Sequence, residues 1–393
     1  MSLTKESKEY YESTDRKHRN AKGQFFTEDK VKELALKDIS IPDKARVLEN
    51  SCGSGEFIKA ILEINPNIEI DGYDIEQDLV DICNNLYPSA NVVLQDFLLM
   101  AHRPIYDFAI GNPPYFEMKK KDSEELHKKY KSVLSGRANI YSMFFKASID
   151  SLRPGGKLIY VVPTSMNNGS YFKNLRKFII ENCNIDDIVL LGDSGFEGVQ
   201  QNTMIIKMTK LKDGETNNGK FVFTTSDISI FSTKCDRLRE LSSKGETLEQ
   251  LKFNVYTGNL VWNQEKGQYV SKYNTKLKVS KFELSLKPYR PTPKKSVVLN
   301  IEPITERSIV LNRVTGAGSN AKIRAAIVDV PTGYYTENHV NYIVRGEDCS
   351  HTLEELLEVL SAAEIIEFIR MLTGNTQISK TELQKIIPFS LDE

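Results

Sequence analysis

Residues 47–57 read Val-Leu-Glu-Asn-Ser-Cys-Gly-Ser-Gly-Glu-Phe, the pattern of a strand, a glycine turn and the start of a helix. Gly53 and Gly55 let the backbone approach a ligand closely, and the N-terminus of the following helix offers free N–H groups. A plain tight turn explains this stretch about as well when it is taken alone. The motifs that follow it decide between the two interpretations.

Short apolar strands alternate with helical patterns through the first half of the chain. This alternation predicts a Rossmann-like, doubly wound α/β sheet, in which ligands bind beyond the carboxyl ends of the strands. The expected strands are residues 46–49, 68–73, 91–94, 107–110, 157–162, 185–191 and 203–208, and the expected helices are residues 57–64, 77–86, 139–152 and 171–182.

Contacts suited to an adenosine follow the second and third strands. Asp74 is placed where a carboxylate accepts hydrogen bonds from ribose hydroxyls, and Ile75 can cover one face of an adenine. Asp96 can accept a hydrogen bond from an adenine amino group, and Phe97 can pack on the ring. A single acid of this kind is more often a helix cap or a solvated loop residue, but the ordered set at successive strand ends favours a ligand.

The first strand ends in Glu49, and the glycines lack both the Gly-x-Gly-x-x-Gly pattern and the Lys-Ser or Lys-Thr of a P-loop. The expected ligand therefore has a ribose and an adenine but no pyrophosphate. S-adenosylmethionine fits this description.

Residues 106–116, Tyr-Asp-Phe-Ala-Ile-Gly-Asn-Pro-Pro-Tyr-Phe, bring an apolar strand to an abrupt stop at Pro113 and Pro114. The extended backbone before each proline displays Asn112 rigidly. The Asn112 side-chain oxygen and the Pro113 carbonyl can each accept one N–H of a nucleobase amine, and Tyr115 can stack on the ring. A polar turn that closes a buried strand is the commoner explanation for an isolated Asn-Pro-Pro, and the preceding motifs overturn it.

In this order, the motifs of residues 20–210 resemble those of amino-group DNA methyltransferases of the gamma arrangement, the TaqI-type adenine-N6 enzymes of bacterial restriction-modification systems. The resemblance is loose beyond that range. It implies a Rossmann-like S-adenosylmethionine-dependent methyltransferase sheet that transfers methyl from S-adenosylmethionine to N6 of a flipped adenine in double-stranded DNA, without a metal.

The resemblance also implies the site residues. A cofactor pocket is expected from Phe26, Thr27, Glu49, Ser51, Gly53, Gly55, Asp74, Ile75, Asp96, Phe97 and Asn112. The target adenine is expected against Asn112, Pro113, Pro114, Tyr115 and Phe196. Phe196 takes the place of a second stacking aromatic of the family, although a single Phe in a glycine-rich loop is more often a packing residue.

Basic residues are concentrated in the second half of the chain. Residues 252–324 contain 14 lysines and arginines against four acids, a local charge of +10 in a chain of net charge −1. This concentration suits a polyphosphate, although a solvated surface also explains it. Short strand-like runs after residue 245 and an amphipathic helix over residues 353–372 predict a C-terminal α+β target-recognition domain over residues 245–393, after a catalytic domain of residues 1–244.

Composition limits the class of protein. A chain of 393 residues favours two domains, and it has no apolar run of membrane-spanning length and no signal-peptide pattern at its start. Its five scattered cysteines and five unclustered histidines indicate reduced thiols and no metal. We expect a cytoplasmic monomer that acts on double-stranded DNA, and leave open whether it has a partner restriction endonuclease.

Three alternatives remain. Enzymes that methylate a glutamine side chain of a release factor, or a base of ribosomal RNA, use a similar Asn-Pro-Pro-Tyr motif, but the basic C-terminal half favours DNA. A non-enzymatic DNA-binding specificity subunit could keep the fold without the chemistry. The joint presence of Glu49, Asn112, Pro113 and Tyr115 argues against that subunit.

Overall fold

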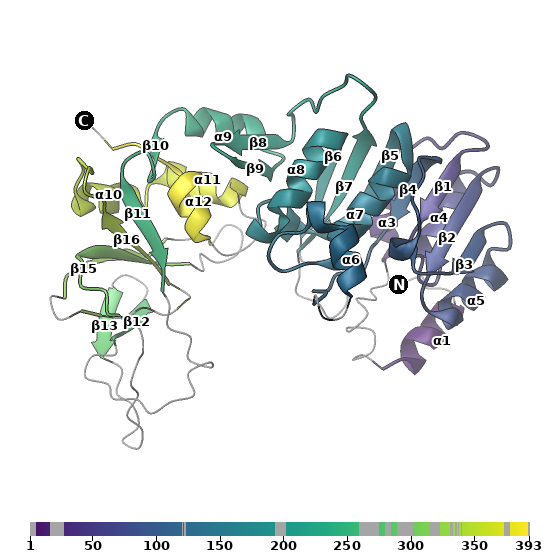
Figure 1. Cartoon of the computed structure of the whole chain (residues 1–393), viewed down its shortest axis with the longest axis horizontal. Helices are drawn as coiled ribbons and strands as arrows, with labels where there is room; N and C mark the ends of the chain where they lie inside the picture. Colours follow the sequence, from purple (N-terminus) through teal and green to yellow (C-terminus); the bar gives the residue numbers. More distant parts are fainter. Residues whose placement is uncertain are drawn as a thin grey trace, which may run out of the picture. The chain divides into compact units, whose positions relative to one another are not determined.

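The computed structural model describes residues 5–15, 27–119, 121, 123–192, 202–258, 275–279, 284–288, 302–313, 323–330, 333, 334, 336, 338, 340–372 and 378–391 (Figure 1). The chain divides into two compact units. Unit 1 comprises Met1–Phe223 and Ser229–Thr233, and unit 2 comprises Thr224–Ile228 and Lys234–Glu393.

The structure divides the chain after residue 233, which is 11 residues before the predicted boundary at 244/245. Helix α9 (Cys235–Ser242) belongs to unit 2, where it packs against α11 (Ala363–Leu372). Arg237 of α9 donates two hydrogen bonds to Glu367 of α11, at 2.9 Å from Nε and 2.8 Å from Nη2. This planar, two-pronged contact ties the helix after the boundary to the C-terminal half.

A seven-stranded sheet in the order β3-β2-β1-β4-β5-β7-β6 forms the centre of unit 1. Strands β1 to β5 run parallel, and β7 runs antiparallel to both β5 and β6. The strands are β1 (Arg46–Glu49), β2 (Glu69–Asp74), β3 (Asn91–Leu94), β4 (Tyr106–Gly111), β5 (Leu152–Pro163), β6 (Cys183–Gly192) and β7 (Thr203–Lys210). The predicted Rossmann-like sheet is confirmed, with a strand at each expected position.

Side chains that alternate along the central strands build a core on each face of the sheet. Val47 and Phe108 pack with α3 (Asp29–Leu36), α4 (Glu56–Ile64) and α5 (Gln77–Leu86). Leu48 and Ala109 point the other way and pack with α6 (Glu124–Lys129), α7 (Ile140–Ser151) and α8 (Lys173–Asn182). The sheet is therefore covered on both faces, which is why its central strands β1, β4 and β5 carry consecutive apolar residues. Helices α1 (Lys5–Ser13), α3 and α6 were not predicted.

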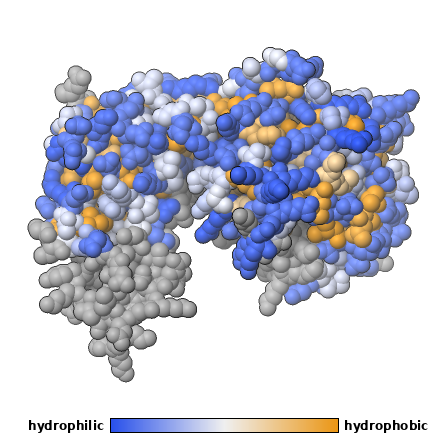
Figure 2. All heavy atoms as spheres, in the orientation of Figure 1, coloured by the Kyte–Doolittle hydropathy of each residue, from blue (hydrophilic) through white to orange (hydrophobic). Residues whose placement is uncertain are grey.

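The face of unit 1 seen in Figure 2 is mainly hydrophilic, with an apolar patch on the side where the β3 edge of the sheet lies. Val93, Leu94 and Leu99 are among the exposed large apolar side chains of unit 1. Because β3 ends the strand order, no strand of the described residues pairs with its outer side.

A buried arginine joins three segments of unit 1. Arg176 of α8 is 2% exposed, and it donates hydrogen bonds to the backbone oxygens of Ser229 at 2.6 Å, Met166 at 3.0 Å and Gly169 at 2.8 Å. These bonds attach the strand β9 (Ile228–Phe231) and the loop after β5 to the helix layer.

Arg176→Ala is expected to lower the free energy of unfolding by about 3 to 5 kcal/mol, because it leaves buried carbonyl oxygens without their donor. Chemical denaturation of the purified protein measures this loss. The control is Lys177→Ala on the same helix, where an exposed pair with Glu181 at 3.8 Å contributes little. Equal denaturation midpoints for the two variants would contradict the role given to Arg176.

Unit 2 contains a four-stranded antiparallel sheet in the order β11-β16-β14-β15. Its strands are β11 (Phe253–Thr257), β14 (Ser308–Asn312), β15 (Ala325–Val328) and β16 (Val340–Arg345), with helices α10 (Leu353–Val359), α11 and α12 (Lys380–Lys385). It also contains the strand pairs β10 (Glu246–Thr247) with β17 (Pro388–Phe389) and β12 (Thr275–Val279) with β13 (Leu284–Pro288). The short strand β8 (Val222–Thr225) pairs with β9, and the division between the units falls within both of these strands. The described part of this half is α+β, as predicted.

The single helix predicted over residues 353–372 is wrong, because the chain turns at residues 360–362 between α10 and α11. Buried Leu356 and Leu360 keep a spacing of four, but the next buried apolar residue, Ile365, follows after five. In one continuous helix, a spacing of five residues would place Ile365 off the apolar face that Leu356 and Leu360 share. The two helices accordingly pack on different partners, α10 on β14 and β15, and α11 on α9.

No helix in the described ranges is long and apolar enough to cross a membrane. Within the same ranges, no three His, Cys, Asp or Glu side chains group in a way that could hold a metal ion. All five cysteines are free and buried.

Candidate active site

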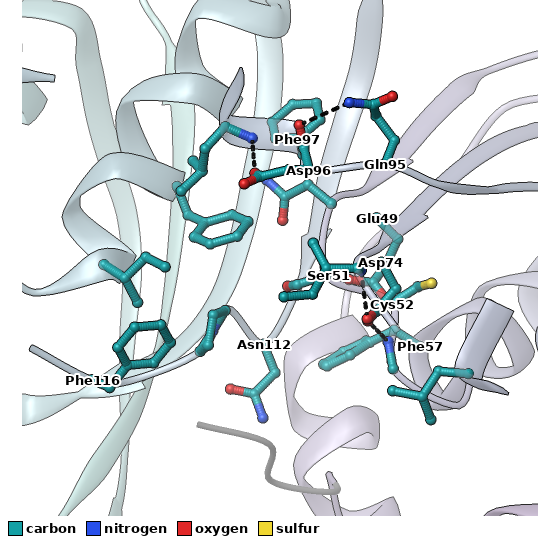
Figure 3. Close-up of a pocket in the computed structure, with 18 of the residues that line it drawn as sticks. Glu49, Ser51, Cys52, Phe57, Asp74, Gln95, Asp96, Phe97, Asn112 and Phe116 are labelled. Atoms are coloured by element: carbon teal, nitrogen blue, oxygen red, sulfur yellow. Dashed lines mark hydrogen bonds between the residues drawn. The ribbon is translucent and has the colours of Figure 1, made fainter. Parts of the chain in front are cut away.

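A cavity of about 250 Å³ opens at the carboxyl ends of the parallel strands of unit 1 (Figure 3). The loops that follow β1, β2, β3 and β4 all contribute to its wall. The predicted site residues that line it are Thr27, Glu49, Ser51, Gly53, Asp74, Ile75, Asp96, Phe97, Asn112 and Pro114. The structure thus brings together most of the residues singled out from the sequence.

Of the other five predicted site residues, three are described and do not line this wall. Phe26 and Phe196 lie outside the described residues. Pro113 and Tyr115 belong to the loop after β4 but are not among the lining residues. Gly55 caps α4 with a φ of +84°, and a Cβ there would come within 2.6 Å of the Tyr87 ring, so this glycine is required by the turn itself.

Asp74 joins the loop after β2 to the glycine turn after β1. Its Oδ2 accepts a hydrogen bond from the Gly53 backbone N–H at 2.9 Å, and its Oδ1 accepts from Ile75 at 2.8 Å and Glu76 at 3.0 Å. The Cys83 thiol also contacts the Gly53 carbonyl oxygen, at 3.2 Å. Gly53 is therefore held from both sides, with its φ at +53°.

Three carboxyl groups converge on the polar end of the cavity. Glu49 is 2% exposed, and burial raises its pKa well above the usual range, with further contributions from the carboxylates of Asp74 and Glu56. Burial also raises the pKa of Glu56, opposed by the Ser54 hydroxyl, which donates at 2.5 Å. The pKa of Asp74 is raised by burial as well. Such a group of desolvated acids favours a cationic ligand.

Glu56 was missed from the sequence. As the first residue of α4, it looked like an acid placed to stabilise a helix N-terminus. Its position directly after the glycine turn was the available signal that it also faces a ligand.

Several buried acceptors in this wall lack a hydrogen-bond partner among the described residues, namely Glu49 Oε1, Asn50 Oδ1 and Ser51 Oγ. Asn50 is nevertheless fixed, because its Nδ2 donates to Ser148 Oγ at 2.5 Å and to Tyr160 Oη at 2.7 Å. A buried acceptor without a donor costs about 1 to 3 kcal/mol, so these atoms suit a ligand that carries N–H or O–H groups.

The opposite end of the cavity is apolar. Phe97 lies 5.3 Å from the ring of Tyr73 and 4.7 Å from that of His102, and Asp96 caps the turn that carries it by accepting from the Leu98 N–H at 2.9 Å. Ile75 is 54% exposed. Sequence reasoning missed further apolar lining residues, Leu98, Phe116, Met118, Leu126, Ile140 and Phe144, together with Tyr10 from α1. Their spacing was that of ordinary core residues.

Asn112 stands at the end of β4, where its amide is bonded at both ends. Its Nδ2 donates to Thr27 Oγ1 at 3.1 Å, and its Oδ1 accepts from the Tyr115 hydroxyl. Tyr115 Oη also contacts the Val161 carbonyl oxygen at 2.7 Å, and its ring meets Tyr141 of α7 edge-on at 6.1 Å. Burial raises the pKa of Tyr115, so its hydroxyl stays protonated and can donate.

Comparison with known proteins gives a family match and several similar relatives. Residues 49–196 match the family described as Eco57I restriction-modification methylase. Type II methyltransferase M.HindII from Haemophilus influenzae is 27% identical over 288 residues, which cover 71% of this chain and 50% of that protein. Type II methyltransferase M.CvrRI from Paramecium bursaria Chlorella virus XZ-6E is 25% identical over 393 residues, or 98% of each chain. Modification methylase CviBIII from Paramecium bursaria Chlorella virus NC1A is 32% identical over 177 residues, covering 43% and 45%.

The sheet defines the first half of the chain as a Rossmann-like domain, and its cavity lies at the carboxyl ends of the parallel strands. More particularly, residues 49–196 match a restriction-modification methylase family, and the relatives named here are type II methyltransferases and a modification methylase. The chain spans about half the length of M.HindII, but nearly all of M.CvrRI. These matches agree with the predicted restriction-modification class.

Proposed function

We propose that this protein transfers a methyl group to N6 of adenine in double-stranded DNA, as a modification enzyme of a restriction-modification system. The observation that carries the proposal is the position of Asn112, whose amide stands in the wall of the same cavity as Glu49, Glu56 and Asp74. An acceptor for an amine and a site for a cationic cofactor are therefore contiguous.

The donors and acceptors of the cavity fit S-adenosylmethionine. Asp74 would face the ribose hydroxyls, Asp96 the adenine amino group, and Phe97 and Ile75 the adenine ring. Glu49 Oε1 and Ser51 Oγ, which have no hydrogen-bond partner among the described residues, suit the cationic methionine end. When bound, the cofactor supplies an electrophilic methyl group on a sulfonium.

The chain itself would orient the amine. The lone pair of a nucleobase amine is delocalised into the ring, so acceptors that draw its N–H groups out of the ring plane raise its nucleophilicity. Asn112 Oδ1 and the Pro113 carbonyl would accept hydrogen bonds from those N–H groups and stabilise the positive charge that develops during attack. The apolar wall would exclude water from the reacting atoms.

Duplex DNA is the proposed substrate because of the C-terminal half. The relatives named above are type II methyltransferases and a modification methylase, and unit 2 follows a catalytic unit that already holds the whole cavity. Base extrusion costs a few kcal/mol, which stacking on Tyr115 would offset in part, by about 1 to 3 kcal/mol. We further propose that unit 2 recognises the target sequence, that the protein acts as a monomer and that it protects DNA from a partner endonuclease.

The decisive experiment measures transfer of labelled methyl from S-adenosylmethionine to plasmid DNA, with ribosomal RNA and release-factor protein in parallel, followed by nucleoside analysis. N6-methyladenine in DNA supports the proposal. N4-methylcytosine in DNA would keep the enzyme class and overturn the target base, and label in RNA or protein alone would overturn the substrate.

Cofactor affinity is expected to rise with pH. The pKa values of Glu49, Glu56 and Asp74 are raised in the folded protein, so the ligand-free native state binds more protons than the unfolded state above the ordinary carboxyl range. Its stability therefore falls as pH rises through that window, while ionisation of the acids favours a cationic ligand.

Calorimetric titration with S-adenosylmethionine from pH 5.5 to 8 should show a tightening Kd and release of protons. S-adenosylhomocysteine, which lacks the sulfonium charge, is the control and should show a weaker dependence. A Kd for S-adenosylmethionine that does not change with pH, without proton release, would contradict the role of the acid cluster.

A further inference from the structure

Thr27 occupies a fixed position beside the loop after β4. It is 5% exposed and lies two residues before α3. That helix is anchored by Val31 and Ala35, which are buried in the core cluster that also holds Val47 of β1. The Thr27 hydroxyl is consequently held at the wall of the cavity by a helix that packs on the sheet.

This hydroxyl is bonded to Asn112, which lies 85 residues away in the sequence, at 3.1 Å from its Nδ2. The other end of the amide is bonded to the Tyr115 hydroxyl, but that hydroxyl also reaches the Val161 carbonyl at 2.7 Å. A phenol has one proton, and a carbonyl can only accept. Asn112 Oδ1 and the Val161 oxygen therefore compete for the same proton.

The two ends of the amide are thus held differently. Tyr115 can give its proton wholly to Val161 and release Asn112 Oδ1 to an incoming amine. The bond from Nδ2 to Thr27 does not compete with the substrate, because it uses the opposite end of the amide. It also limits rotation of the amide about its last side-chain bond. The acceptor Oδ1 therefore faces the N–H groups of the amine, and the donor Nδ2 does not.

We infer that Thr27 is a positioning residue for methyl transfer. It holds the Asn112 amide while Asn112 Oδ1 exchanges its hydrogen bond from Tyr115 for one from the substrate amine. This inference rests on the proposed role of Asn112. It differs from the role that the resemblance implied for Thr27, contact with the cofactor, and the two roles predict different effects on cofactor affinity.

The test compares Thr27→Val, Thr27→Ser and the wild-type protein. Valine keeps the branched shape but loses the oxygen, whereas serine keeps the oxygen and loses only a methyl group. The matched control is Thr203→Val in β7, because Thr203 is 1% exposed and its hydroxyl has no hydrogen-bond partner within the described residues. The measurements are kcat and KM for the methyl acceptor, and the Kd of S-adenosylhomocysteine by calorimetry.

Thr27→Val is expected to lower kcat at least about tenfold, the effect of losing one oriented hydrogen bond in a restrained site, with the Kd of S-adenosylhomocysteine unchanged. Thr27→Ser should recover most of kcat, and Thr203→Val should match the wild type. An unchanged kcat in Thr27→Val, a raised Kd that accounts for its defect, or a defect of the same size in Thr27→Ser would each overturn the inference.

Wild-type protein is assayed first on DNA, RNA and protein. If it methylates only RNA or protein, the proposed DNA substrate fails, and the Thr27 comparison is made on the substrate that is methylated. The kcat ratios then still support or overturn the positioning role, so the two failures are distinguishable.

Discussion

Replacing Asn112 by alanine is expected to lower kcat for methyl transfer by about 10²- to 10³-fold, the effect of removing one preorganised group that stabilises developing charge. The Asn112 side chain reaches the cavity from the end of β4, and its amide is held by Thr27 on one side and Tyr115 on the other. The methyl side chain of alanine has no hydrogen-bond acceptor. Water that enters the space left by the amide would be mobile and would not draw the amine toward the geometry of attack.

The variant should still bind the cofactor, because the acids and the glycine turn that would hold it come from the ends of β1 and β2. Single-turnover methyl transfer and calorimetry with S-adenosylhomocysteine separate the two properties. Asn85→Ala, an exposed asparagine of α5 outside the cavity, is the matched control. If Asn112→Ala kept a large share of the wild-type rate, or lost cofactor binding in parallel with the rate, the catalytic assignment would fail.

Glu49→Gln is expected to raise the Kd of S-adenosylmethionine by about 10- to 100-fold, the range for losing a buried hydrogen bond to a charged group. Glu49 is buried beside Asp74 and Glu56, and its Oε1 contacts no hydrogen-bond donor among the described residues. Glutamine has nearly the same shape, but it presents a neutral amide to a cationic ligand.

The same substitution should stabilise the ligand-free protein at neutral and higher pH. The pKa of Glu49 is raised by burial and by its acidic neighbours, so ionising it costs the native state free energy that the unfolded state does not lose. Thermal unfolding without ligand should therefore show a higher Tm for Glu49→Gln than for the wild type at pH 8, and little difference at pH 5.

A single variant would thus gain stability and lose affinity, as expected where a binding site stores unfavourable electrostatic energy. Glu63→Gln is the control, because Glu63 is an exposed acid of α4 paired with Lys59 at 3.8 Å. It should change neither property. A lower Tm in Glu49→Gln together with an unchanged Kd would mean that Glu49 is only a structural residue.

The sequence by itself determined the sheet and the strand ends. The central strands β1, β4 and β5 contain local runs of apolar residues, and such a run becomes a strand wherever its faces can be buried. Because parallel strands expose their carboxyl ends at one edge, the polar residues after β1, β2, β3 and β4 had to face a common site. Asp74, Asp96 and Asn112 could therefore be placed together before their distances were known.

The tertiary structure alone decided how these groups are paired. The bond between Thr27 and Asn112 spans 85 residues, and the crowding of Glu56 against Glu49 depends on how α4 leaves the glycine turn. The apolar wall from α7 and the break between α10 and α11 depend in the same way on which elements pack together. Periodicity and turn chemistry act over a few neighbouring residues, whereas hydrogen-bond partners, burial and pKa values depend on distances that exist only after the strands and helices have packed.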